Sequence, residues 1–69
     1  MTQDDADDIA FRKLRRWSFG DTDRQWILEK WRTGYECKMF YPGGHTSSHF
    51  GTTISEAIDK ALRAANGNS

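Results

Sequence analysis

The run from residue 35 to residue 41 constrains the fold of this chain more than any other feature. Its side chains alternate, so one face of an extended strand would carry Tyr35, Cys37, Met39 and Tyr41, and the other Glu36, Lys38 and Phe40. A strand needs neighbours for its backbone groups. The preceding Arg32-Thr33-Gly34 is typical of a three-residue hairpin with a bulge. Residues 24–32 are therefore predicted to form an antiparallel partner strand, with a helix capped by Asp23 as the alternative.

Two amphipathic segments flank this hairpin. Near the C-terminus, Thr53 and Glu56 have the spacing of a capping box. They precede an apolar stripe at helical spacing, formed by Ile54, Ala57, Ile58, Ala61, Leu62 and Ala65. Gly67 would follow the end of this helix. Near the N-terminus, a second stripe predicts a helix over residues 6–17, formed by Ala6, Ala10, Leu14 and Trp17.

These elements predict one α+β domain over residues 6–66, with the order α-β-β-β-α. The polar residues 1–5 are expected to be a disordered tail, 18–23 a turn, 47–51 a short third strand and 67–69 a second tail. Short connections favour a three-stranded antiparallel sheet with both helices on one face. The other face of the sheet is then left open.

The register of the hairpin decides which tryptophan occupies the open face. If Trp31 lies opposite Tyr35, the open face carries Trp26 together with Lys38 and Phe40. A register that differs by one residue places Trp31 there instead. We therefore expect a contact surface formed by Phe40 with one of these tryptophans and by nearby cations, with the candidate residues Trp26, Trp31, Phe40, Lys38, Arg24 and Arg32.

The small size of the chain also favours a contact surface. With 69 residues the core is thin, and Cys37, as the only cysteine, excludes a disulfide framework. Nine aromatic residues are more than such a core is expected to hide. A binding surface or a homodimer would use the surplus. The sequence shows no signal peptide, membrane span or cofactor motif, so a cytoplasmic protein without a cofactor is expected.

Charge is unevenly distributed although the net charge is zero. Residues 1–11 carry four acids and no base, whereas residues 12–38 carry eight bases and four acids. This polarity complements a helix dipole, and it also fits a partner surface. A protein partner is favoured, because Trp, Tyr and Arg are enriched at binding hot spots. The alternative is a nucleic-acid-binding module, in which phosphates would contact Arg15, Arg16, Lys30 and Lys38.

Catalytic and metal-binding patterns are weak. Cys37, His45 and His49 are the residue types of an open zinc site or a thiol nucleophile. Cys37 falls on the expected core face, however, where a thiol is inert. The glycine pair Gly43-Gly44 does not lead directly into a helix, as a phosphate-binding loop would. The sequence therefore predicts a protein that is not an enzyme and holds no metal.

Two resemblances bear on function. The segments YECKMFYPGG and FGTTISEAIDKAL, within residues 35–62, are similar to the strand–glycine–Thr-x-x-Glu-Ala–helix pattern of HicB-type antitoxins, with Thr53, Glu56 and Ala57 at the helix start. This resemblance implies an antitoxin-like protein that occludes another protein. By its small size and acidic N-terminal segment, the chain also looks like the small inhibitors carried by phages and mobile elements. The α-β-β-β-α order also resembles the double-stranded-RNA-binding topology, but residues 52–55 lack the lysines which that family places at the start of its last helix.

Overall fold

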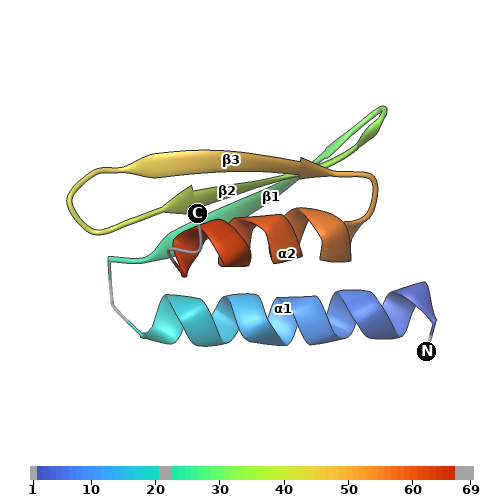
Figure 1. The fold of residues 1–69 in the computed structure, drawn as a ribbon, viewed down its shortest axis with the longest axis horizontal. Helices are drawn as coiled ribbons and strands as arrows, with labels where there is room; N and C mark the ends of the chain where they lie inside the picture. Colours follow the sequence, from blue (N-terminus) through green and yellow to red (C-terminus); the bar gives the residue numbers. More distant parts are fainter. Residues whose placement is uncertain (1, 21–22, 67–69) are drawn as a thin grey trace.

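The predicted order of elements is confirmed by a computed structural model of the chain, which describes residues 2–20 and 23–66. It contains α1 (Gln3–Phe19), β1 (Gln25–Trp31), β2 (Gly34–Phe40), β3 (Thr46–Gly51) and α2 (Ile54–Ala65) (Figure 1). The three strands form one antiparallel sheet in the order β1-β2-β3. Residues 25–31 of the segment 24–32 therefore form a strand, and the alternative helix is not formed. The predicted tail at 67–69 lies outside the described residues.

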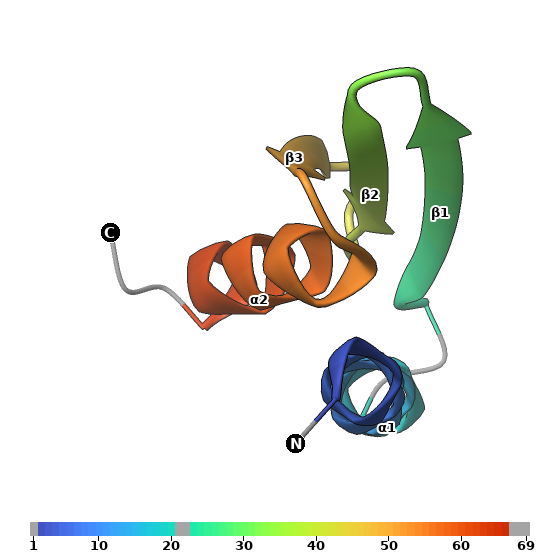
Figure 2. The ribbon, with the colours of Figure 1, turned by 90° about the vertical axis from the view of Figure 1, so that its right-hand side faces the viewer.

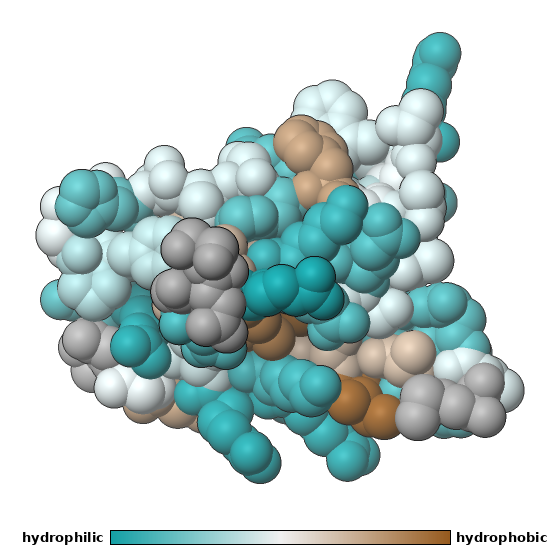
Figure 3. Space-filling model, viewed as in Figure 1, coloured by the Kyte–Doolittle hydropathy of each residue, from teal (hydrophilic) through white to brown (hydrophobic). Residues whose placement is uncertain are grey.

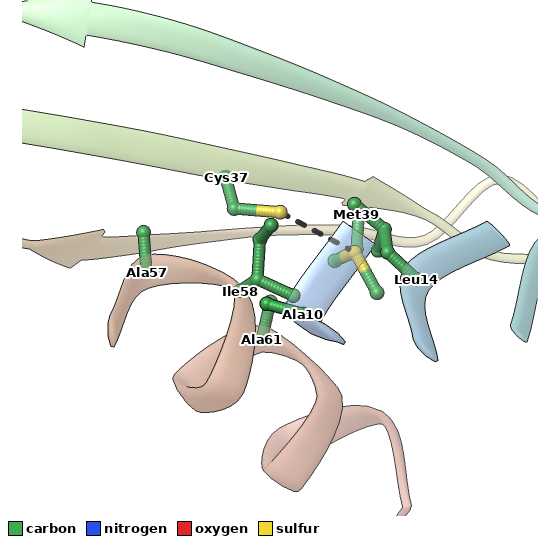
Figure 4. Packing of buried hydrophobic residues seen from close by; sticks show 7 residues of the cluster. All are labelled: Ala10, Leu14, Cys37, Met39, Ala57, Ile58 and Ala61. Carbon is green, nitrogen blue, oxygen red and sulfur yellow. Dashed lines mark hydrogen bonds between the residues drawn. The ribbon is translucent and has the colours of Figure 1, made fainter. Parts of the chain in front are cut away.

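Both helices cover the same face of the sheet, as expected, and lie side by side (Figures 1 and 2). The core between helices and sheet is small. It consists of Ala10, Leu14, Cys37, Met39, Ala57, Ile58 and Ala61, each at most 2% exposed (Figure 4). Five aromatic side chains, those of Phe11, Trp17, Trp26, Tyr35 and Tyr41, pack around this cluster. Most of the aromatic surplus is therefore used to extend a thin core.

The N-terminal helix is longer than predicted at both ends. It begins at Gln3, so the expected tail at residues 1–5 is wrong for the described residues 2–5. Thr2 caps the helix, because its hydroxyl accepts from the N–H of Asp5 while the Asp5 carboxylate accepts from the N–H of Thr2. At the other end the helix continues through Ser18 and Phe19, which were expected to lie in a turn.

The capping box predicted at the start of α2 is only half formed. Thr53 accepts a hydrogen bond from the N–H of Glu56 at 3.1 Å. The Glu56 carboxylate does not return to the cap. It accepts from the hydroxyl of Thr52 at 2.8 Å and pairs with Lys60 at 3.3 Å. A second cap comes from α1, where Asp7 accepts from the N–H of Ser55 at 3.0 Å.

The hairpin register differs from the predicted three-residue loop. Trp31 pairs with Gly34, which leaves only Arg32 and Thr33 in the turn. Among the described residues, only glycines have a positive φ, and Gly34 takes the value +155°. A Cβ at Gly34 would collide with the carbonyl oxygen of Gly51. This close approach of the start of β2 to the end of β3 requires glycine at position 34.

Candidate protein-binding face

The register assigns alternate residues of each strand to the open face of the sheet. Lys30, Leu28 and Trp26 lie opposite Tyr35, Cys37 and Met39, and these six residues face the helices. The open face therefore carries the alternate positions, which are Gln25, Ile27, Glu29 and Trp31 of β1, Glu36, Lys38 and Phe40 of β2, and Thr46, Ser48 and Phe50 of β3. The register alternative with Trp31 on the open face is the one that the structure adopts.

Three large apolar side chains on this face are exposed to solvent. Ile27 is 46% exposed, Trp31 50% and Phe50 57%. Phe40 is partly buried on the same face. An isolated exposed apolar side chain is ordinary, but a group on adjacent strands is typical of a binding surface. We call Ile27, Trp31, Phe40 and Phe50 the apolar sheet patch.

A buried carboxylate lies within this patch and holds one of its members. Glu36, on the central strand, is only 5% exposed. Its Oε1 accepts a hydrogen bond from the indole Nε1 of Trp31 at 2.9 Å. Trp31 is therefore held in one orientation while half of its surface remains exposed. Such a restrained aromatic side chain loses little conformational freedom when a partner binds it.

The charges on the open face do not make it basic. The ammonium of Lys38 lies 3.2 Å from Glu29 Oε1, and this hydrogen bond and the charges of Glu29 and Glu36 raise the pKa of Lys38. Two carboxylates thus accompany one ammonium on this face. The expected basic-aromatic surface is not assembled here.

Two of the six predicted contact residues do not reach the open face. Trp26 faces the helices, where its ring lies 6.1 Å from that of Phe11. Arg24 precedes β1 and folds back on α1, with its guanidinium 5.3 Å from the Trp17 ring centre and a 3.2 Å hydrogen bond to the Trp17 carbonyl. Arg32 is exposed in the β1–β2 turn. The sequence prediction of the contact surface did not include Ile27 and Phe50. The signal for them was the alternation of Ile27 with Leu28 and of Phe50 with His49 along the strands.

A groove of about 460 Å³ extends the patch around one end of the sheet. Trp31, Tyr35 and Phe50 supply its aromatic wall, and Glu56 and Lys60 of α2 supply an ion pair. Hydrogen bonding from Thr52 and the nearby Lys60 lower the pKa of Glu56. The groove thus combines apolar walls with both charges, which suits a side chain of a protein partner.

The proposed phosphate contacts fall on different surfaces. Arg15 and Arg16 lie on the exposed side of α1, whereas Lys30 faces the helix side of the sheet and Lys38 the open side. A groove of about 580 Å³ between the two helices is lined by Lys13, Arg16, Trp17, Asp59, Leu62, Arg63 and Asn66. Most basic residues of the described chain therefore lie on the helices, away from the apolar sheet patch.

The thiol and imidazole groups do not form a reactive site. Cys37 is fully buried, and burial raises its pKa to about 11. Its thiol donates to Met39 Sδ at 3.8 Å and not to His49, its cross-strand partner (Figure 4). His49 bonds Ser47 at 2.9 Å, and burial lowers the pKa of its imidazole. In residues 2–20 and 23–66, no group of three or more His, Cys, Asp or Glu side chains could hold a metal ion.

The described helices offer no segment with the length and apolar character needed to cross a membrane. No family model, curated protein or solved structure matches the chain.

Proposed function

We propose that this protein is a small, non-catalytic protein-binding module, an inhibitor or adaptor that docks a protein partner on the apolar sheet patch and occludes it. The observation that carries the proposal is the exposure of Ile27, Trp31 and Phe50 on one sheet face that neither helix covers. Aromatic anchors surrounded by polar groups are the usual composition of binding hot spots. The similarity of residues 35–62 to HicB-type antitoxins suggests an antitoxin-like role, and the small size of the chain suggests a phage-type anti-defence role.

The arrangement of Trp31 supports this proposal further. Its hydrogen bond to Glu36 restrains the ring before a partner arrives. Trp31 belongs to the patch and also lines the groove, together with Lys60. A partner segment that covers Trp31 would thus meet an apolar surface on one side and an ion pair on the other. We expect Trp31 and Phe50 to contribute most of the binding free energy.

The alternative, a nucleic-acid-binding sheet face, is less well supported. A face that stacks bases also needs cations for the phosphates. Here the ammonium of Lys38 is paired with Glu29, and Glu36 adds a second carboxylate. We therefore favour a protein as the partner of this face.

The experiment is site-specific photo-crosslinking in the native host, followed by affinity measurements with the purified partner. A photoreactive amino acid at position 50 should capture a discrete protein, whereas the same group at position 19, where Phe19 is 86% exposed on α1, should not capture that protein. Trp31→Ala and Phe50→Ala should each weaken binding about 30-fold or more, as hot-spot residues do. Phe19→Ala is the matched control. Unchanged affinity in folded Trp31 and Phe50 variants would reject the proposal.

A further inference from the structure

The outward surface of α1 has a charge pattern that the sheet-face function does not use. Asp5, Asp8, Ile9, Arg12 and Arg16 follow one another at helical spacing and are all exposed, and Arg16 also lines the groove between α1 and α2. The first four line a shallow hollow of about 410 Å³ on the helix surface. We call these five residues the outer stripe. Its N-terminal half is acidic and its C-terminal half is basic.

The outer stripe is accessible along its whole length. α1 forms one edge of the molecule, and no other helix or strand of the described chain covers its outer side (Figures 1 and 2). In the space-filling view this edge is predominantly hydrophilic, with polar side chains extending outward (Figure 3). The inner side of the helix is used for the core through Ala10 and Leu14.

The charges of the stripe are largely unneutralised within the chain. The ion pairs found among residues 2–20 and 23–66 join Lys38 to Glu29 and Lys60 to Glu56. Neither pair involves α1. Asp5 belongs to the capping box and Asp7 caps α2, but Asp8, Arg12 and Arg16 have no carboxylate or cation partner in the part of the chain described.

We propose that α1 pairs with the α1 of a second copy, antiparallel, around a two-fold axis near the middle of the helix. A two-fold interface requires a surface that complements itself. Reversing the helix places each acidic half against the basic half of the other copy. A parallel arrangement would place acid on acid and base on base.

The spacing of the stripe sets the register of this pair. With the axis near Ala10, Asp8 of each copy faces Arg12 of the other, and Asp5 faces Arg16. The hollow lined by Asp5, Asp8 and Ile9 then receives the aliphatic part of an arginine side chain from the second copy. The methylene groups of this arginine cover Ile9. Every charged residue of the outer stripe gains an opposite charge in this register.

The chemistry of the stripe favours a second copy over other occupants. A nucleic acid would be attracted by Arg12 and Arg16 but repelled by Asp5 and Asp8 one or two turns away. The zero net charge of the chain removes long-range repulsion between copies. A 17-residue helix is about 25 Å long, so the interface is small and the dimer is weak and salt-sensitive.

The experiment is a charge swap followed by sedimentation velocity over a range of protein concentrations. The native chain should form a dimer whose fraction falls as salt rises, because the Debye length shortens from about 10 Å at 0.1 M to about 3 Å at 1 M ionic strength. Asp8→Arg alone and Arg12→Asp alone should each give monomers, since each places like charges opposite each other twice. An equimolar mixture should restore a dimer that contains one copy of each variant.

Arg32→Asp, in the β1–β2 turn far from α1, is the control and should dimerise like the native chain. Circular dichroism checks that each variant is folded, and Asp8→Asn and Arg12→Gln replace any variant that is not. Monomers of the native chain at every concentration, a dimer that survives both single variants, or a mixture that stays monomeric would each overturn the proposal. A dimer lost in Phe50→Ser but not in Asp8→Arg would instead place self-association on the apolar sheet patch.

Discussion

At the scale of single residues, the pairing of Trp31 with Gly34 places Trp31 on the open face of the sheet and Trp26 on the helix face. The alternation of residues 35–41 was enough to divide the central strand into two faces, and this division is confirmed by the pairing with β1 and β3. It could not choose between Trp26 and Trp31, because that choice depends on one residue of register. That register consists of backbone pairing between β1 and β2, such as Trp31 with Gly34, and it leaves no pattern in the sequence.

Replacing Gly34 by alanine tests whether the close approach of this residue to Gly51 requires glycine. We expect Gly34→Ala to lower the free energy of unfolding by more than about 2 kcal/mol, because a positive φ costs a residue with a Cβ about 1–2 kcal/mol and the added atom also collides with Gly51. Gly44→Ala is the matched control, since Gly44 has a φ of +86° but no atom within 4 Å of the point where an alanine Cβ would lie. Urea denaturation measures both. An equal loss of unfolding free energy in Gly34→Ala and Gly44→Ala would show that the approach of Gly34 to Gly51 is unimportant.

Cys37 is predicted to be unreactive in the folded protein. Its thiol is buried, and burial raises its pKa from an ordinary 9.0 to about 11. A thiol-specific disulfide reagent at pH 8 should therefore modify the native chain no faster than the chain unfolds, and should modify it immediately in urea. Rapid stoichiometric reaction of the native protein would contradict the burial of this side chain.

The same shift predicts a pH dependence of stability. The thiol of the unfolded chain ionises near pH 9, whereas the folded chain keeps its proton up to about pH 11. The contribution of Cys37 is thus fully present below pH 9 and is lost as the pH rises towards 11. The difference in unfolding free energy between the native chain and Cys37→Ala should shrink over this interval, and a constant difference would contradict the shift.

At the scale of elements, local signals predicted the helices and strands, and tertiary contacts set their ends. The apolar stripes placed both helices, and composition placed the turns. The start of α1 was predicted too late, because the charged residues 3–5 carry no apolar signal and the cap at Thr2 was not recognised. The cap that Asp7 supplies to Ser55 spans 48 residues and could not be predicted from local sequence.

This interhelical cap gives a prediction for the element scale. Asp7→Ala should lower the free energy of unfolding by about 0.5–2 kcal/mol, the usual cost of losing an N-cap acceptor. Asp8→Ala, one residue away and exposed, should change it by no more than about 0.5 kcal/mol. Thermal and urea denaturation at dilute, monomeric concentrations compare the two. An equal effect of both changes would mean that only the charge near the start of α1 matters.

At the scale of the whole molecule, the basic and aromatic residues that are neighbours along the chain separate onto different surfaces. The sequence placed eight bases in residues 12–38 together with all three tryptophans. In the fold, Arg15 and Arg16 point outward from α1, Trp17 and Trp26 extend the core, and Trp31 lies on the open sheet face. Counting charges along a chain cannot reveal this separation, because it depends on which side of each element faces the core.

The separation leads to a prediction about residual nucleic-acid binding. Because the chain has no net charge, binding of a single-stranded oligonucleotide should be weak and seen only at low salt. Any such binding should depend on the helix cations, so Arg15→Ala with Arg16→Ala should weaken it and reduce the slope of log affinity against log salt by about 0.7 for each phosphate contact removed. Lys38→Ala should leave both quantities unchanged, since the ammonium of Lys38 is already paired with Glu29. Fluorescence anisotropy over a salt series measures these slopes. A lower slope in Lys38→Ala, together with weaker binding in Phe50→Ala, would place phosphates and bases on the open sheet face and favour a nucleic acid over a protein as its partner.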